Sequence, residues 1–508
     1  MKIVILGGVA AGTKIAAKLM REGRNNEVLI LNKGADISYA GCGLPYYVGH
    51  VIEEKESLIV NTPQKYEALT GARVLTRMEA VEVDRDAKQV TAVHLDTREK
   101  TVYSYDKLVI ATGASPVRPP IEGVDLENVF FMRTPEDAIA LRNLISDGGI
   151  KRAVVVGAGY IGLEIAENLA KDGVKPFVLD MAPHVLPGFD EEFATYIEGK
   201  LADAGIPVVT GVRVTGLEGE GGKVKKVLTD RKAYKADLVV LSAGIRPNTA
   251  FLDGTGLEMV KGTLLTNEAG QTNDPDIYAA GDCAMVHSAI TGKPAWSPMG
   301  STANINGRII AQNIMGKELR YRGSLGTAVC QLPGLNVGRT GLTEAQAKAE
   351  GFDPISVVTI VDDKAHYMPG AATFTMKLIA DRSTQRLLGV QVAGPGAVDK
   401  IVDITVTAIQ CGATLDQLDG ADFAYAPPFS TAIHPFAHTL NVLKNKLSGA
   451  FETFTPAEFA QGLAKDYRIV DASLKPTIEG APYVDLTSVT GPLKDFGPEE
   501  KLLLICNK

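Results

Sequence analysis

Cysteine is scarce in this chain, and its cysteines form neither a C-x-x-C pair nor a metal-binding spacing. The five lie far apart, at Cys42, Cys283, Cys330, Cys411 and Cys506. This pattern excludes a disulfide framework and a zinc site, and it is typical of a reducing compartment. We expect Cys283, Cys330 and Cys411 to be buried small hydrophobic residues.

Long hydrophobic runs and an excess of one charge are also missing. No segment is long and apolar enough to span a bilayer, and the chain enters a strand at Ile3 without the layout of a signal peptide. A net charge of −8 spread over 508 residues argues against nucleic acid or an anionic membrane as a partner. We therefore expect a cytoplasmic protein of three or four domains.

Two glycine-rich turns each follow a short apolar run and precede a helical pattern. The first contains Gly7, Gly8, Val9, Ala10, Ala11 and Gly12, and the second contains Gly157, Ala158, Gly159, Tyr160, Ile161 and Gly162. Glycines here allow a tight turn and let the backbone approach a pyrophosphate, which binds the N–H groups at the start of the helix. Only the second turn matches G-x-G-x-x-G completely, because Val9 replaces the middle glycine of the first.

The residue that ends the next strand helps to discriminate between nucleotides. After the second glycine-rich turn this residue is Asp180, in the place of the usual ligand of a ribose 2′-hydroxyl. A carboxylate there repels a 2′-phosphate, and no arginine follows it closely, so the sequence favours NADH over NADPH. After the first glycine-rich turn the corresponding residue is Asn32, followed by Lys33, and the Asn32 amide can still form a hydrogen bond with a ribose hydroxyl.

Cys42 stands apart from the other cysteines. It lies between Gly41 and Gly43 in a loop of small residues and precedes Pro45 and two tyrosines. We expect it at the start of a helix, where the pKa of a thiol is lowered. The alternative is a buried thiol in a tight Gly-Cys-Gly turn. Two nucleotides and one thiol together indicate a flavin that passes electrons from a nicotinamide to sulfur.

Three further motifs, at residues 105–114, 241–248 and 272–282, complete a resemblance to a known family. With the two glycine-rich turns, they follow the order found in FAD-dependent pyridine nucleotide–disulfide oxidoreductases. The chain resembles the single-cysteine branch of that family, which includes coenzyme A-disulfide reductase and NAD(P)H persulfide reductases. The resemblance covers residues 1 to about 450.

The resemblance implies an α/β fold with two Rossmann-like dinucleotide-binding domains and an α+β dimerisation domain. The FAD-binding domain would comprise residues 1–113 and 246–320, the NAD(H)-binding domain residues 114–245, and the dimerisation domain residues 321–449. A homodimer is implied, in which each active site borrows residues from the partner.

The resemblance also implies roles for individual residues. It places FAD against the first glycine-rich turn and against Asn32, Lys33, Cys42, Ala111, Thr112, Gly113, Gly281, Asp282 and Ala303, with Asp282 on the ribityl chain. It places NADH against the second turn, with Tyr160 over the flavin face, Glu164 beside the nicotinamide, and Asp180 and Gly244 nearby. Coenzyme A is a third molecule to consider, with Arg21, Ser38 and Asn304 as substrate-binding candidates, and no metal is implied.

The candidates for catalysis are Cys42, Tyr367, Tyr425 and His434. No second cysteine is close enough for an internal disulfide, so Cys42 must cycle with an external thiol or through a sulfenic acid. Tyr367 and Tyr425 match the family's substrate-side tyrosines, which reach in from the other subunit; core aromatic residues are the alternative. His434 is either an acid–base group near neutral pH or a structural histidine.

The segment 450–508 resembles the first half of a rhodanese domain. Its motifs are at residues 454–459, 467–471, 483–486 and 501–506. Cys506 falls at the persulfide-carrying cysteine of such a domain, but the loop and helices that would follow it are missing from this sequence. We expect an incomplete rhodanese-like segment that points to sulfane sulfur. The alternative is a terminal strand that packs on the dimer.

Three functions are compatible with these features. The first is an NADH-dependent reductase of a small-molecule disulfide or persulfide, such as coenzyme A disulfide, coenzyme A persulfide or polysulfide. The second is an NADH oxidase or peroxidase in which Cys42 cycles through sulfenic acid. The third is a flavoprotein redox sensor without turnover. Fold alone cannot separate them, but related oxidases and peroxidases typically have a histidine where this chain has Ala10, which favours the first.

Overall fold

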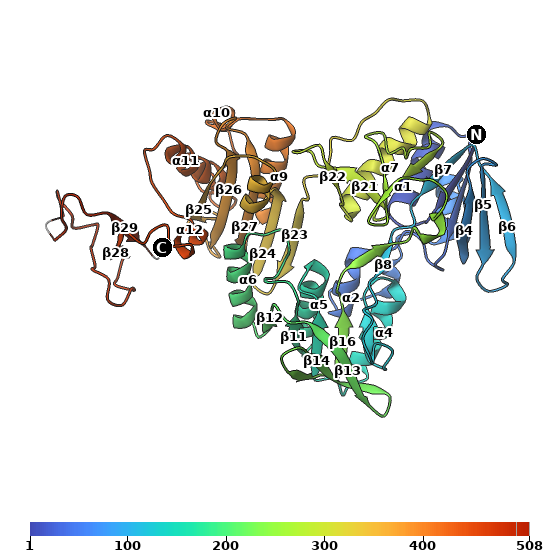
Figure 1. Cartoon of the computed structure of the whole chain (residues 1–508), viewed down its shortest axis with the longest axis horizontal. Coiled ribbons are helices and arrows are strands. Elements are labelled where there is room, and N and C mark those ends of the chain that lie inside the picture. Colours follow the sequence, from blue (N-terminus) through green and yellow to red (C-terminus); the bar gives the residue numbers. More distant parts are fainter. Residues whose placement is uncertain (494, 507–508) are drawn as a thin grey trace. The chain divides into compact units, whose positions relative to one another are not determined.

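The computed structural model describes residues 1–493 and 495–506, and these divide into two compact units. The first unit consists of residues 1–187 and 197–333, and the second of residues 188–196 and 334 onward. Figure 1 labels the helices and strands along the chain. In the described part, every helix is too short or too polar to cross a membrane.

A five-stranded parallel sheet in the first unit carries the first glycine-rich turn. Its order is β20-β7-β1-β2-β3, formed by β1 (Lys2–Leu6), β2 (Glu27–Asn32), β3 (Arg73–Thr76), β7 (Lys107–Ile110) and β20 (Ile277–Ala279). The helices of this region are α1 (Ala11–Glu22), α3 (Pro63–Thr70) and α7 (Gly300–Ile314). Helix α1 packs on α7 and buries Ile15, Ala16 and Leu19 in the core.

A second five-stranded parallel sheet carries the second glycine-rich turn. Its order is β12-β11-β10-β16-β9, formed by β9 (Val129–Phe131), β10 (Arg152–Val156), β11 (Lys175–Leu179), β12 (Val208–Val209) and β16 (Leu238–Leu241). The helices nearby in sequence are α4 (Pro135–Ser146), α5 (Tyr160–Lys171) and α6 (Glu191–Asp203). Strand β16 is buried at every residue, as expected of an inner strand in a parallel sheet.

Two short strands connect the regions around these sheets. Strand β8 (Ala114–Pro116) pairs antiparallel with β17 (Ile245–Pro247), so that Ser115 lies opposite Arg246. Hydrogen bonds between Thr112 and Asn248 extend this pairing, with the Thr112 hydroxyl 2.7 Å from the Asn248 carbonyl. The motifs at residues 105–114 and 241–248 are therefore neighbours in space.

Smaller elements complete the first unit. Two antiparallel sheets are formed by β4 (Met78–Asp84), β5 (Gln89–His94) and β6 (Lys100–Ser104), and by β13 (Val214–Glu220), β14 (Lys223–Thr229) and β15 (Ala233–Lys235). A mixed sheet is formed by β18 (Met259–Val260), β19 (Thr263–Leu265), β21 (Ala284–His287) and β22 (Pro294–Ala295), in which only β19 and β21 are parallel. The short helices are η1 (Gly41–Gly43), α2 (Leu44–Val48), η2 (Lys55–Leu58) and η3 (Ala250–Leu252), and the last strand is β23 (Ala328–Leu332).

An antiparallel sheet with helices forms most of the second unit. Its strands β24 (Leu335–Gly341), β27 (Leu387–Gly394), β26 (Thr373–Asp381) and β25 (Pro354–Asp362) are adjacent in that order. Its helices are α8 (Glu344–Ala349), α9 (Val398–Gln410), α10 (Leu415–Leu418) and α11 (Pro435–Leu447). One core cluster joins the sheet to α9 and α11, and Phe374 and Phe436 are among its largest buried side chains.

A buried lysine holds a segment of distant sequence in the second unit. Lys377 is only 1% exposed, and its Nζ lies 2.9 Å from Asp190, 2.6 Å from Glu192 and 3.1 Å from Glu344. Gln391 also donates a hydrogen bond of 2.6 Å to Asp190. Residues 188–196 therefore group with the second unit, although their position in the sequence predicts the NAD(H)-binding domain.

The C-terminal segment contains one short helix and two parallel strands. Helix α12 (Pro456–Ala460) precedes β28 (Arg468–Asp471), which pairs with β29 (Leu502–Ile505). The Asp471 carboxylate accepts hydrogen bonds from the backbone N–H groups of Ser473 and Ile478, at 3.0 Å and 2.9 Å. The exposed Cys506 directly follows β29. The rhodanese-like identity of this segment stays a prediction.

Candidate functional site

The first glycine-rich turn is packed against the end of a neighbouring strand. Gly7 has a φ of +105°, and a Cβ placed on it would lie 2.1 Å from the Ala111 carbonyl oxygen, so only glycine fits. The Asn32 side chain accepts a hydrogen bond of 3.0 Å from the N–H of Gly8. The neighbouring Lys33 is directed elsewhere, with its Nζ 2.7 Å from Glu79. The turn is thus fixed by the residue that ends β2.

The second turn repeats this geometry. Gly157 has a φ of +114°, and a Cβ on it would lie 2.4 Å from the Ser242 carbonyl oxygen. The Asp180 carboxylate accepts hydrogen bonds from the N–H groups of Ala158 and Ala182, at 2.5 Å and 2.7 Å. Asp180 and Asn32 therefore occupy corresponding places at the ends of β11 and β2, which explains how an amide can stand where an acid is usual.

The two helices that follow the turns begin without a side-chain cap. Helix α1 starts after Ala10 and α5 after Gly159, and neither of these residues has a side chain that could accept a hydrogen bond from the N–H groups of the first turn. Helices α3 and α4, by contrast, have threonine caps at Thr62 and Thr134. Uncapped N–H groups at a helix start are the donors that a phosphate requires. Both sites fit a dinucleotide.

The second flavin motif lies against the first turn. A Cβ on Gly281 would be 3.6 Å from the Ala11 side chain and 4.0 Å from that of Ala303. The next residue, Asp282, accepts a hydrogen bond of 3.0 Å from Arg133, which precedes α4. The structure thus brings together Ala11, Gly281, Asp282 and Ala303, which are far apart in sequence.

Cys42 lies in the 3₁₀ turn η1, directly before the five-residue helix α2. The residue is exposed, but partial desolvation of its sulfur raises the pKa of the thiol. The charges of Glu164 and Asp282 raise it further, and Arg133 lowers it. The expected lowering of the Cys42 pKa is therefore wrong for this structure, because burial and two carboxylates outweigh one guanidinium.

The other cysteines separate into two kinds. Cys283 and Cys330 are 0% and 4% exposed, as expected. The expectation for Cys411 is wrong, since this residue caps the C-terminal end of α9, is exposed, and lines a cavity of about 700 Å³ beside that helix. Cys330 is more than a packing residue, because its thiol is a hydrogen-bond partner of the Glu164 carboxyl group.

Two predicted catalytic residues of the second unit are brought together. Tyr367 and Tyr425 are 64% and 50% exposed, and a hydrogen bond between their side chains contributes to raising the pKa of Tyr367. Their exposure does not support the alternative that they are core aromatic residues. The pair presents two hydroxyl groups to the surface of the second unit.

His434 has the features of a structural histidine. It is 5% exposed, its Nδ1 accepts a hydrogen bond of 3.2 Å from the N–H of Phe436 at the start of α11, and its ring stacks on Phe423. Burial first, and then the charge of Lys400, lowers its pKa to about 4. At neutral pH the ring is uncharged and serves as a helix cap, so the structure disfavours the acid–base hypothesis for His434.

The three substrate-binding candidates lie in different surroundings. Arg21 is exposed in the last turn of α1, and Asn304 is exposed on α7 with its amide donating to Gly300 over 2.8 Å. Ser38 has a φ of +50°, a strained conformation for a residue with a side chain, and its N–H donates to the Gly8 carbonyl over 2.8 Å. Ser38 is thus hydrogen-bonded to the first glycine-rich turn, whereas the other two candidates lie on the surfaces of helices.

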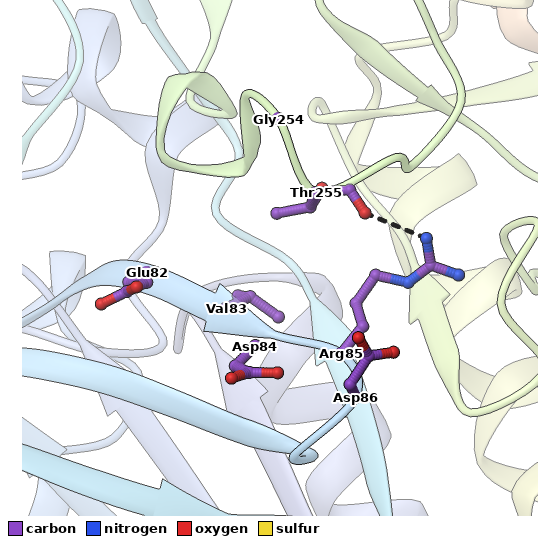
Figure 2. A pocket seen from close by; sticks show the side chains of 7 residues that line it. All are labelled: Glu82, Val83, Asp84, Arg85, Asp86, Gly254 and Thr255. Atoms are coloured by element: carbon purple, nitrogen blue, oxygen red, sulfur yellow. Dashed lines mark hydrogen bonds between the residues drawn. The ribbon is translucent and has the colours of Figure 1, made fainter.

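A polar cavity of about 490 Å³ lies away from these residues (Figure 2). It is lined by residues 82–86 together with Gly254 and Thr255. Figure 2 shows Arg85 reaching to the Thr255 carbonyl, 3.0 Å away, and the same guanidinium pairs with Asp274 at 2.8 Å. Because this charge is already neutralised and neither turn lines the cavity, we do not assign a site there. Among the described residues, no group of three or more potential ligands could hold a metal.

Comparison with known proteins identifies the family. Residues 1–303 match the pyridine nucleotide–disulphide oxidoreductase family, and residues 328–437 match its dimerisation domain. The chain belongs to the pyridine nucleotide–disulfide oxidoreductases. This confirms the predicted α/β fold of the family and its use of FAD and a nicotinamide nucleotide.

Relatives of this chain within the family include proteins named as persulfide reductases and proteins named as NADH oxidases. The chain is 36% identical to the NAD(P)H coenzyme A polysulfide/persulfide reductase of Pyrococcus horikoshii, over 87% of this chain and 98% of that protein. It is 34% identical to the NADH oxidase of Methanocaldococcus jannaschii, over 88% of this chain and 100% of that protein. The structure of a NAD-dependent persulfide reductase from A. fulgidus matches 100% of this chain and 94% of that chain, with 34% identity and a TM-score of 0.94.

Sequence reasoning missed several residues around Cys42. Arg133 precedes α4, Tyr46 lies in α2 and Cys330 lies in β23, and each contacts or acts on a predicted site residue. Tyr46 is one of the two tyrosines that follow Pro45, so the sequence itself indicates that it lies near the Cys42 thiol. No sequence motif pointed to Arg133 or Cys330, because their roles depend on packing between distant segments.

Proposed function

We propose that this chain is an NADH-dependent flavoenzyme that reduces a small-molecule disulfide or persulfide through Cys42. Coenzyme A disulfide, coenzyme A persulfide and polysulfide are the acceptors to compare. The observation that carries the proposal is the likeness to a persulfide reductase over the entire chain. The NADH oxidase relative aligns with 88% of the chain.

The residues around the two turns would hold the nucleotides. FAD, when bound, accepts a hydride from NADH and delivers two electrons to sulfur. The uncapped start of α1 would bind its pyrophosphate, and Asp282, aligned by Arg133, would accept a hydrogen bond from its ribityl chain. The uncapped start of α5 and the carboxylate of Asp180 would bind NADH.

Cys42 would carry the sulfur chemistry. Its thiolate attacks one sulfur of the substrate S–S bond, forms a new S–S bond to that sulfur and expels the other sulfur as a thiolate or hydrosulfide. Two electrons from NADH then cleave the S–S bond on Cys42, which returns the cysteine as a thiolate and releases the second sulfur product. NADH supplies one of the two protons that the products require and solvent supplies the other. Ionisable groups acting on Cys42 are carboxylates and a guanidinium, with no histidine among them.

We place this reaction in a homodimer in the cytoplasm. The chain has the family's dimerisation domain. We propose that Tyr367 and Tyr425 of each subunit serve the Cys42 site of the other, where a phenol can protonate a departing sulfur. All five cysteines are free, which supports a reducing location. We also propose that residues 450–508 are an incomplete rhodanese-like segment that hands sulfane sulfur to this site.

The decisive experiment measures how fast each acceptor reoxidises a flavin that NADH has reduced under anaerobic conditions. Enzyme reduced anaerobically with NADH is mixed with coenzyme A persulfide, coenzyme A disulfide, polysulfide or, separately, oxygen. We expect rapid reoxidation by a sulfur acceptor, lost by at least about a thousandfold in Cys42→Ser and retained in Cys411→Ser, an exposed control thiol. Rapid reoxidation by oxygen alone would favour the NADH oxidase, and slow reduction by NADH in the first step would favour a redox sensor.

A further inference from the structure

Glu164 is held between helix α2, which directly follows Cys42, and strand β23. It lies in helix α5, which packs against α2 on one side and β23 on another. The Tyr46 hydroxyl of α2 donates a hydrogen bond of 3.1 Å to its Oε1. The Cys330 thiol of β23 is its second partner. The carboxyl group therefore has a fixed place, four residues along the chain from the start of α5.

Among the residues that the structure describes, no cation pairs with this carboxyl group. The ionisable groups that act on it are Tyr46 from α2, Cys330 from β23 and Glu167 from α5 itself, and its own charge acts on Cys42 in η1. Lys171, the lysine on this helix, pairs with Glu167 at 2.9 Å, and none of the ion pairs between described residues includes Glu164. Burial first, and then the charge of Glu167, raises the pKa of Glu164 to about 6, against the hydrogen bonds of Tyr46 and Cys330.

The same carboxylate acts on the redox thiol. Cys42 lies in η1, which runs directly into α2, so the tyrosine that holds Glu164 is four residues from the thiol. The negative charge of Glu164 raises the pKa of Cys42, together with burial and Asp282, while Arg133 opposes them. Because the interaction is mutual, a thiolate on Cys42 must also favour protonation of Glu164.

We propose that Glu164 is the proton-exchanging partner of Cys42, and that Tyr46 and Cys330 position it for this role. When the S–S bond on Cys42 is cleaved by two electrons, the new thiolate adds one negative charge, and Glu164 takes up one proton from solvent. When Cys42 is next consumed by bond formation or is protonated, Glu164 releases that proton. The net charge of the pair stays constant through the cycle.

This inference rests on the proposed role of Cys42 as the redox thiol, but it is measured without a sulfur substrate. The probe is the rate at which iodoacetamide alkylates Cys42 in the FAD-loaded, dithiol-reduced enzyme, followed by peptide mass spectrometry between about pH 5 and about pH 10. In Glu164→Gln the carboxylate is gone, so we expect the Cys42 pKa to fall by about one unit and alkylation at pH 7 to be about tenfold faster. An unchanged Cys42 pKa in this variant would overturn the proposal.

Two tyrosine variants test the positioning role. Tyr46→Phe removes the donor that stabilises the Glu164 carboxylate, so the pKa of Glu164 should rise above its value of about 6. Tyr47→Phe is the matched control, because Tyr47 packs under Arg142 and lies next to Tyr46 in the same helix. Reduced-minus-oxidised infrared difference spectra should show a protonated carboxyl band on reduction of wild type. That band should titrate to higher pH in Tyr46→Phe, stay unchanged in Tyr47→Phe and vanish in Glu164→Gln.

The outcomes distinguish this inference from the proposed function. If no carboxyl band accompanies reduction while coenzyme A persulfide is still reduced through Cys42, the inference falls and the proposed function stands. If the band and the shift of the Cys42 pKa are present but no sulfur acceptor reoxidises the flavin, the proposed function falls and the coupling of Glu164 to Cys42 stands. A Tyr46→Phe variant that moves neither the band nor the alkylation profile contradicts the role of Tyr46.

Discussion

Two glutamates, one in each unit, show how neighbouring groups set the pKa of a partly buried carboxyl group. Glu164 is hydrogen-bonded by Tyr46 and Cys330 but meets no cation, and burial raises its pKa to about 6. Burial also raises the pKa of Glu344, but a hydrogen bond from Lys348 and the charge of Lys377 outweigh it and lower that pKa to about 2. Both residues are glutamates near the start of a helix, so the cations make the difference.

The two environments suit different tasks. The pKa of Glu344 is lowered to about 2, and the charges of Asp190 and Glu192 raise the pKa of Lys377 against the effect of burial, so the pair of Lys377 and Glu344 stays ionised over the whole physiological range and cannot exchange protons. Glu164 is close to half protonated a little below neutral pH, and it acts on Cys42. An acid without a counter-ion beside a thiol is typical of a reactive site, whereas a compensated cluster is typical of a structural one.

The largest expected effect comes from breaking the compensated cluster. Lys377→Met leaves the Asp190 and Glu192 side chains, each 8% exposed, without their cation, so the free energy of unfolding should fall by about 3 to 5 kcal/mol. Lys348→Met is the control, because Lys348 is 62% exposed although it also pairs with Glu344, and it should change stability by less than about 1 kcal/mol. Denaturant unfolding of both variants measures the difference. Equal losses would show that burial of Lys377 is not what matters.

A smaller effect, of opposite sign at the two glutamates, should appear in the pH dependence of stability. The pKa of Glu344 is lowered by folding, so its contribution is present above its unfolded pKa and is lost as pH falls toward 2. The pKa of Glu164 is raised, so folding binds a proton there, and stability falls as pH rises from its unfolded pKa through about 6.

At pH 7.5, therefore, Glu344→Gln should lower the free energy of unfolding, and Glu164→Gln should raise it by about 1 to 2 kcal/mol. As pH falls, the Glu164 difference should shrink between about pH 7 and about pH 4.5, whereas the Glu344 difference should begin to shrink only below about pH 4.5, measured by urea unfolding of the FAD-loaded enzyme from about pH 3 to about pH 8. A Glu164→Gln variant that is destabilised at pH 7.5 would contradict the view that its charge lacks compensation.

The smallest effect concerns the two nucleotide turns. Asp180→Ser keeps a hydrogen-bonding group at the end of β11 but removes the charge that we expect to meet the ribose of NADH. Reduction of the flavin should require about fivefold more NADH, while the requirement for NADPH should fall or stay the same. Asp203→Asn, at the exposed end of α6, is the control. A variant with an unchanged NADH requirement would show that Asp180 serves only to hold the amides of Ala158 and Ala182.

The sequence predicts well where a requirement is local. Gly7 and Gly157 need a positive φ and a close approach to another strand, and their motifs mark both turns. The equivalence of Asn32 and Asp180 also follows from their place at strand ends. Such features depend on a few adjacent residues, which is why the α/β fold and the family could be predicted.

Features that depend on distant neighbours could not be predicted in this way. The pKa of Cys42 is raised first by burial and then by the charges of Glu164 and Asp282, which other segments of the fold bring to it, so a rule about helix starts gave the wrong direction. His434 resembles a catalytic histidine in sequence, but burial against Phe423 makes it a helix cap. The Lys377 cluster has no local signature at all.

The most direct test of the central claim is the mass of the Cys42 peptide, measured before and after reduction. Anaerobic enzyme is mixed with coenzyme A persulfide, quenched with an alkylating agent and digested, and a second sample receives one equivalent of NADH before quenching. The account predicts a sulfur or coenzyme A adduct on Cys42 that NADH removes, with no sulfur or coenzyme A adduct on Cys283, Cys330 or Cys411 in either sample. An adduct that persists after NADH, or a Cys42 that is modified only to sulfenic acid by oxygen, would contradict it.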